Sequence, residues 1–183
     1  MKRILLLAFI FAPFVANAQK ATSQEVINQL LRNMRGGVEV VNINGRSSFH
    51  TYVGTGYKHY FRPSNAYLFP QADFKWGRYD VGNGYIETSS LAIPVLIGYE
   101  LFAQDLIGLN VFTGGRYEQV LHSSHSTNAI SNKINNTQVG VLGGANIRLA
   151  NRFGITASYY YGLTPLFQDG TGRISSFSLA FTF

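Results

Sequence analysis

The chain has 183 residues, no cysteine, 19 glycines and many aromatic side chains (11 tyrosines and 14 phenylalanines). Charged residues make up 13% of it, against about 25% in ordinary soluble domains. This composition excludes a coiled coil, a helical bundle and a disulfide-stapled scaffold. The formal net charge is +6, but no Lys/Arg cluster forms a nucleic-acid footprint, so we predict no nucleic-acid partner.

The first 18 residues have the three parts of a secretory signal peptide. Lys2 and Arg3 form the basic start, residues 4–15 form a nearly unbroken apolar run, and Ala16-Asn17-Ala18 fits the small-x-small cleavage pattern. The apolar run is shorter than the ~20 residues that a spanning helix needs. We therefore predict a signal peptide over residues 1–18.

Residues 19–36 are predicted to form an N-terminal segment with one short amphipathic helix. Thr22 and Glu25 fit a capping box, and apolar residues recur at helical spacing up to Met34 before Gly36-Gly37 ends the pattern. Two interpretations stay open: the helix packs on the protein's own end, or it lies at the membrane interface.

From residue 37 to the last residue, 183, apolar residues alternate with small or polar ones. This period of two predicts strands with one apolar face each. The pattern gives about eight strands, and several are long enough to cross a bilayer at a tilt. The predicted strands lie at about 37–44, 48–60, 68–76, 91–101, 107–117, 139–149, 155–161 and 177–183.

The connections between these strands alternate in length. Tight turns are expected at 63–65, 103–105 and 150–151, and longer polar segments at 79–85, 122–137 and 163–173. Short periplasmic turns and long outer loops are typical of transmembrane barrels. We therefore predict an all-β fold, a closed antiparallel transmembrane β-barrel in the outer membrane.

The face opposite the apolar one carries four acids and four bases. A barrel of about eight strands has an interior that side chains fill, and buried charges there must be paired. We therefore predict a self-plugged lumen in place of a conducting pore. The predicted lumen charges are Glu39, Lys58, Asp73, Lys75, Glu100, Arg116, Glu118 and Arg148.

The segments Ser90–Tyr99 and Tyr159–Thr164 and the terminal Phe183 resemble the PorT-like outer-membrane β-barrel family of Bacteroidota. The resemblance covers roughly residues 37–183. It implies an outer-membrane location, a role that extends to protein secretion in one member, and recognition by the barrel-assembly machinery. The residues that would form this C-terminal assembly signal are Tyr159, Phe181 and Phe183.

One cluster has the composition of a chemical site, His122-Ser123-Ser124-His125-Ser126. A hydrolase needs a nucleophile, a base and an orienting acid in contact. The predicted loop around this cluster supplies no acid, although Asp80 and Asp169 in other outer loops could approach it. His122 and His125 also lack a third metal ligand, so neither a catalytic nor a metal site is predicted.

These observations predict a non-catalytic barrel without cofactor, with a binding, structural or envelope-machinery role. Its expected partners are outer-membrane lipid, the barrel-assembly machinery and an envelope protein. Two alternatives remain open. One is a lipid-modifying hydrolase or acyltransferase that uses His122, His125 and loop serines, and the other is a narrow channel.

Overall fold

The computed structural model describes residues 23–81, 84–104, 106–126, 134–149 and 153–183. The predicted signal peptide lies outside these residues. The elements in chain order are α2 (Ser23–Arg32), β1 (Arg35–Ile43), β2 (Arg46–Gly56), β3 (His59–Tyr60), β4 (Ala66–Asp80), β5 (Tyr85–Ala103), β6 (Ile107–His125), β7 (Thr137–Leu149), β8 (Phe153–Pro165) and β9 (Arg173–Thr182).

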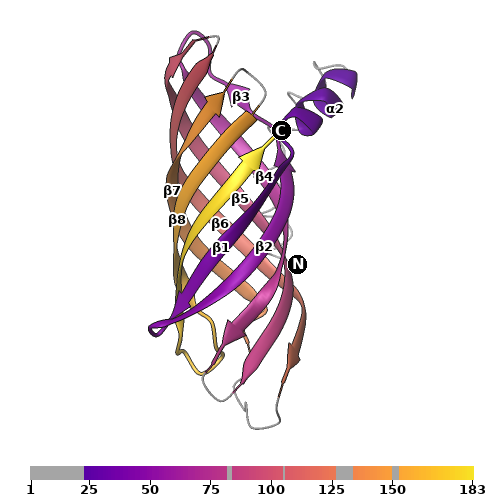
Figure 1. Ribbon diagram of the computed structural model, residues 1–183, viewed down its shortest axis with the longest axis vertical. Helices are drawn as coiled ribbons and strands as arrows, with labels where there is room; N and C mark the ends of the chain where they lie inside the picture. The colour runs from indigo at the N-terminus through magenta and orange to yellow at the C-terminus, as the bar shows by residue number, and fades with distance from the viewer. Residues whose placement is uncertain (1–22, 82–83, 105, 127–133, 150–152) are drawn as a thin grey trace, which may run out of the picture.

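The strands form one closed antiparallel barrel (Figure 1). Each long strand pairs with the strand that follows it in the chain, β1 also pairs with β9, and a pairing between β2 and β4 closes the ring. The two-residue strand β3 only extends the edge of β4. The predicted fold, a closed antiparallel barrel of eight long strands, is confirmed.

The two ends of the barrel differ in their connections. The long-loop end is the end where β4 leads to β5, β6 to β7 and β8 to β9, and it also carries the tight β1–β2 turn. In that turn Asn44 and Gly45 have positive φ angles of 52° and 83°, as a two-residue hairpin requires. The short-turn end carries the connections between β5 and β6 and between β7 and β8, with α2 and the end of β9 beside it (Figure 1).

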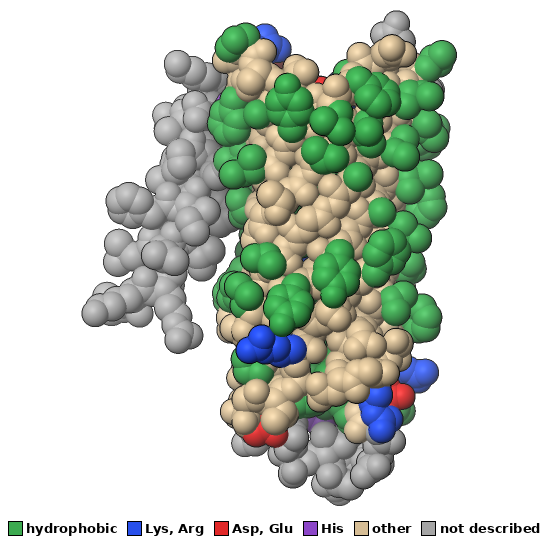
Figure 2. Space-filling view, turned by 90° about the vertical axis from the view of Figure 1, so that its left-hand side faces the viewer, with side chains coloured by type: hydrophobic (Ala, Val, Ile, Leu, Met, Phe, Trp, Pro, Cys, Tyr) green, Lys and Arg blue, Asp and Glu red, His purple; other side chains and the backbone are tan. Residues whose placement is uncertain are grey.

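The outside of the barrel is covered with exposed apolar side chains. Figure 2 shows them spread over one side of the wall, whereas charged side chains gather near its ends. This arrangement follows from the alternation in the sequence, because every second strand residue points outward. Outward members include Val53, Phe74, Ile97, Val111, Val141, Ile155, Leu179 and Phe181.

The apolar wall leads to a depth-dependent prediction. Val141 is 48% exposed within β7, and Leu149 is 40% exposed at its last residue. We expect Val141→Arg to lower the free energy of unfolding by about 2–4 kcal/mol, and Leu149→Arg by only about 0–1 kcal/mol. Guanidinium unfolding from phospholipid vesicles, followed by the fluorescence of Trp76, measures both. Equal losses would contradict a lipid-facing wall.

The lumen at the long-loop end is filled by apolar side chains. The connection between β8 and β9 folds inward, so that Leu166 and Phe167 are buried. Asn135 holds this connection, since its side-chain amide donates to the carbonyls of Pro165 and Phe167. The buried apolar cluster consists of Val41, Ile43, Tyr79, Ile86, Val120, Ile134, Tyr160, Leu166, Phe167 and Ile174.

The helix α2 differs from its predicted extent. It ends at Arg32, and β1 already begins at Arg35 because Arg35 pairs with Gly54 and Thr182 in the ladders. Its apolar stripe is half exposed, at 50% for Ile27 and 58% for Leu31. In the part of the chain that the structure describes, no helix is long and apolar enough to cross a membrane.

Candidate functional site

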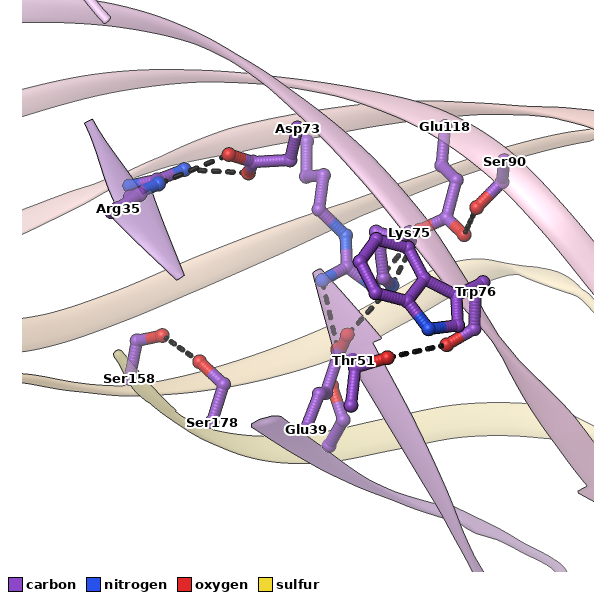
Figure 3. Close-up of polar contacts among 12 residues, drawn as sticks. Arg35, Glu39, Thr51, Asp73, Lys75, Trp76, Ser90, Glu118, Ser158 and Ser178 are labelled. Atoms are coloured by element: carbon purple, nitrogen blue, oxygen red, sulfur yellow. Dashed lines mark hydrogen bonds and ion pairs between the residues drawn. The ribbon is translucent and has the colours of Figure 1, made fainter. Parts of the chain in front are cut away.

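Four charged side chains meet in the middle of the lumen, and we call them the lumen ring: Glu39, Lys75, Arg116 and Glu118. Lys75 Nζ lies 2.6 Å from Glu39 Oε2 and 3.0 Å from Glu118 Oε2. Arg116 contacts the same two carboxylates at 2.9 and 3.3 Å. Acids and bases therefore alternate around the ring, and Figure 3 shows Lys75 between Glu39 and Glu118. Both carboxylates are only 1% exposed.

Neighbouring strands complete the coordination of the ring. Ser90 donates to Glu118 Oε1 at 2.7 Å, and Ser176 donates to Glu39. The guanidinium of Arg116 lies 3.5 Å from the ring centroid of Tyr160. A buried charge is tolerated only when partners of this kind replace its water, so the ring is a filled polar layer across the lumen.

The other predicted lumen charges lie between this ring and the short-turn end. Asp73 accepts two hydrogen bonds from Arg35, at 2.5 and 3.0 Å. Arg35 falls within the predicted helical segment 19–36, but it is the first residue of β1, and its pairing with Asp73 is not among the predicted lumen charges. Arg148 lies 3.3 Å from Glu100, and Lys58 packs among aromatic rings.

The aromatic residues of the predicted assembly signal lie on the outside of the barrel. Tyr159 on β8 and Phe181 on β9 are exposed members of the apolar wall, and Phe183 follows β9 directly. Their recognition by the barrel-assembly machinery stays a prediction.

A β-bulge in β6 creates a second polar site, on the outer wall. Ser90 of β5 pairs with Val120, whereas Ser89 pairs with His122, so Leu121 is an extra residue in the ladder. An inserted residue reverses the alternation that follows it. His122 and Ser124 therefore share the outward face with Ser89 and Glu87, which lie opposite them.

Two rows of side chains cross the strands at this point. Ser124, Glu87 and Arg78 form one row across β6, β5 and β4, and His122, Ser89 and Trp76 form the next. They line a shallow groove of about 510 Å³. We call it the wall groove, and it is lined by Phe49, Thr51, Trp76, Gly77, Arg78, Glu87, Thr88, Ser89, His122 and Ser124.

These positions correct the interpretation of the His/Ser cluster as a loop. His122 to His125 are the last residues of β6, because they pair with residues 86–89 of β5. His125 lies opposite the inward residue Ile86. His122 and His125 thus belong to opposite faces and cannot act as one pair.

The wall groove contains an acid, Glu87, that the sequence alone does not place near the His/Ser cluster. Glu87 lies directly opposite Ser124. The acids considered from the sequence have other partners: Asp80 pairs with Arg46 at 3.8 Å, and Asp169 accepts hydrogen bonds from Thr171 that lower the pKa of its carboxyl.

The groove brings a hydroxyl, an imidazole and a carboxylate within reach of one another. Side chains directly opposite each other in a ladder have Cβ atoms about 4.5–5.5 Å apart, and diagonal neighbours lie about 7–8 Å apart, within reach of long side chains. No hydrogen bond joins His122, Ser124 and Glu87 among the described contacts. Catalytic hydrogen bonds often tighten only when substrate is bound, so the arrangement suits acyl transfer that begins with substrate binding.

No candidate metal site is found among the residues that the structure describes. Among residues 23–81, 84–104, 106–126, 134–149 and 153–183, no group of three or more His, Asp or Glu side chains could hold a metal ion.

The chain matches a known family model, and several solved structures are similar to it. The model for the outer membrane protein β-barrel domain matches residues 23–168. The crystal structure of the outer membrane enzyme PagL has 18% sequence identity and a TM-score of 0.56, covering 80% of this chain and 97% of that chain. Neisserial surface protein A (NspA) has 12% identity and a TM-score of 0.50, covering 81% of this chain and 92% of that chain. Comparison with curated protein sequences gives no significant match.

The similarity to PagL contradicts the prediction that this barrel is not an enzyme. That prediction rested on the absence of an acid near His122 and on the interpretation of the His/Ser cluster as a polar loop. A barrel of similar fold is an outer membrane enzyme, so this fold does not exclude catalysis. The wall groove also contains an acid, Glu87, near His122.

Proposed function

This chain belongs to the family of outer membrane β-barrel domain proteins, and from that premise we propose that it is a lipid esterase whose active site is the wall groove. The observation that carries the proposal is the outward placement of His122, Ser124 and Glu87 on two paired strands. The similarity to the outer membrane enzyme PagL supports it at the level of the fold.

The position of the groove favours a lipid substrate. Transmembrane barrels place their longer loops outside the cell and their short turns in the periplasm. The groove is built near the long-loop end of β5 and β6 and opens on the apolar wall. Its side chains therefore face the headgroup region of the outer leaflet.

The lining of the groove matches an amphipathic substrate. Phe49 and Trp76 are exposed apolar side chains that would pack along an acyl chain. The guanidinium of Arg78, 5.5 Å from the ring centroid of Tyr85, would bind a headgroup phosphate or carboxylate. The substrate class is therefore an anionic lipid carrying an acyl ester.

The reaction follows the serine-hydrolase scheme. Ser124 Oγ attacks the ester carbonyl carbon while His122 takes its proton. His122 then returns that proton to the leaving alcohol oxygen, which gives an acyl-serine and a free alcohol. Water, deprotonated by His122, releases the fatty acid and restores Ser124. Glu87 orients the imidazole and stabilises its charged form.

Lipid analysis tests the proposal. The full chain is inserted into vesicles of lipid A and phosphatidylglycerol, and released fatty acid and deacylated lipid are measured by mass spectrometry. We expect release by the native protein and a loss of at least about 10³-fold for Ser124→Ala.

Ser123→Ala is the matched control, because Ser123 lies opposite the inward residue Thr88 on the other face of β6. We expect its activity to equal that of the native protein. Unchanged lipids with the native protein, or equal activity in the Ser124 and Ser123 variants, would overturn the assignment.

A further inference from the structure

The lumen holds a second, separate site between the lumen ring and the short-turn end. A cavity of about 440 Å³ lies there, within the ~300–1,000 Å³ typical of small-molecule pockets. Its lining includes Glu39, Lys75 and Arg116 of the ring at one side, and Arg32 of α2 and Phe153 at the start of β8 at the other. With the ring and the apolar cluster filling the lumen beyond it, the cavity is a cup that faces the periplasm.

The cup is lined by more cations than carboxylates. Glu39 and Asp73 are the acids on its surface, and both already bind cations. The cationic side chains of its lining are Arg32, Arg35, Lys58, Lys75, Arg116 and Arg148. Glu118 and Glu100, outside the lining, also bind Lys75, Arg116 and Arg148. The positive charge left for an entering anion is therefore that of Arg32 and Lys58.

Lys58 is one of two cations in this lining that form no ion pair with a carboxylate among the described residues, and the other is Arg32. Its Nζ lies 4.4 Å from the ring centroid of Tyr67, and 5.4 and 5.9 Å from those of Phe69 and Tyr60. In the described part of the chain it makes no ion pair with a carboxylate. Aromatic faces attract an ammonium group but do not neutralise it, so Lys58 remains free to bind an anion.

The aromatic ring nearest to Lys58, that of Tyr67, is closely packed. Tyr67 is 2% exposed, and its ring occupies the space beside Gly98 of β5. A Cβ atom at Gly98 would lie 2.2 Å from this ring, which no real contact allows. The glycine thus provides the room in which Tyr67 and Lys58 are positioned.

A buried unpartnered acceptor is a second, independent sign of a ligand. Asn110 is 1% exposed and lines the cup. Its amide nitrogen donates to Asn146, but its Oδ1 has no hydrogen-bond partner in the structure. Such an atom costs about 1–3 kcal/mol unless a donor reaches it, and a hydroxyl group of a bound molecule can supply that donor.

From these features we propose that the cup binds a small hydroxylated aromatic carboxylate from the periplasm. The carboxylate pairs with Lys58, the aromatic body packs against the rings that line the cup, and a hydroxyl donates to Asn110. This inference is independent of the proposed esterase, because the wall groove lies on the outer face of the barrel and near the opposite end.

Ligand-observed ¹⁹F NMR tests the proposal with two probes of equal shape, 4-fluorobenzoate and its neutral amide 4-fluorobenzamide. The full chain is placed in phospholipid nanodiscs, and empty nanodiscs measure partitioning into lipid. We expect saturable binding of 4-fluorobenzoate, and binding of the amide weaker by about tenfold or more, the value of one charge-assisted hydrogen bond.

Three variants locate the site. Lys58→Met should remove the preference for the acid, and Lys58→Arg should keep it because the charge remains. Arg173→Met, at the long-loop end, is the control and should bind both probes as the native chain does. Heat-modifiable migration on a gel verifies that each variant is folded. Equal binding of acid and amide, an unchanged preference in folded Lys58→Met, or binding no greater than in empty nanodiscs would overturn the proposal.

Discussion

Replacing Glu118 with leucine is expected to lower the free energy of unfolding by about 3–5 kcal/mol, the cost of leaving buried charge uncompensated. The change leaves Lys75 and Arg116 with Glu39 as the remaining carboxylate of the ring, and it also removes the acceptor of Ser90. Guanidinium unfolding of the chain from phospholipid vesicles measures the loss. On a gel, we expect the band of the folded barrel to convert to the band of the unfolded chain at a lower temperature than in the native protein.

A second substitution should recover much of that stability. In Glu118→Leu combined with Lys75→Met, Arg116 and Glu39 remain as one balanced pair at 2.9 Å. We expect the loss of unfolding free energy in the double variant to be about 1–3 kcal/mol smaller than the sum of the losses in the two single variants. The exposed pair of Arg46 and Asp80, 3.8 Å apart, is the matched comparison, and Arg46→Met should cost at most about 1 kcal/mol. Equal losses at both places would contradict a structural role for the ring.

Glu87→Gln is expected to lower kcat for lipid ester hydrolysis by about 10²–10⁴-fold, with KM nearly unchanged. In serine hydrolases the acid orients the imidazole and stabilises its charged form. Replacing that acid with the corresponding amide lowers kcat by about 10⁴-fold. Glu87 lies diagonally across the ladder from His122, so its contribution acts through the imidazole. Initial rates of fatty-acid release at several lipid concentrations separate kcat from KM.

Asp169→Asn is the control for this experiment. Asp169 lies near the same end of the barrel, and its carboxylate accepts from the backbone and the hydroxyl of Thr171. We expect full activity from this variant. A loss in Asp169→Asn, or full activity in Glu87→Gln, would assign the orienting role to a different acid.

The wall of the barrel could be predicted from the sequence because alternation is a local property. In runs such as Val139–Leu149 and Phe177–Phe183, every second residue is apolar or small, so these residues share one face whatever the partner strand is. The same alternation put Glu39, Lys75, Arg116 and Glu118 on the inward face. What it could not give is which acid meets which base, because Glu39 and Arg116 are 77 residues apart.

The wall groove could not be predicted from the sequence because it depends on the register between two strands, which the sequence of one strand does not determine. The inserted Leu121 reverses the alternation, and only the pairing with β5 reveals this insertion. Counting odd positions from Ile107 onward assigns His122 to the wrong face. The signal in the sequence is the pair Leu121-His122. An outward apolar residue is followed directly by a polar residue that also faces outward, with no inward-facing residue between them.

The lumen ring also has a consequence for how the barrel assembles. Glu39 belongs to β1, which pairs with β9 as well as β2, whereas Lys75, Arg116 and Glu118 come from the middle of the chain. A partly assembled sheet without β1 contains two of the cations and one of the carboxylates. The four charges therefore balance only when β1, β4 and β6 are all in the barrel, so a chain that inserts without β1 carries an electrostatic penalty that the addition of β1 removes.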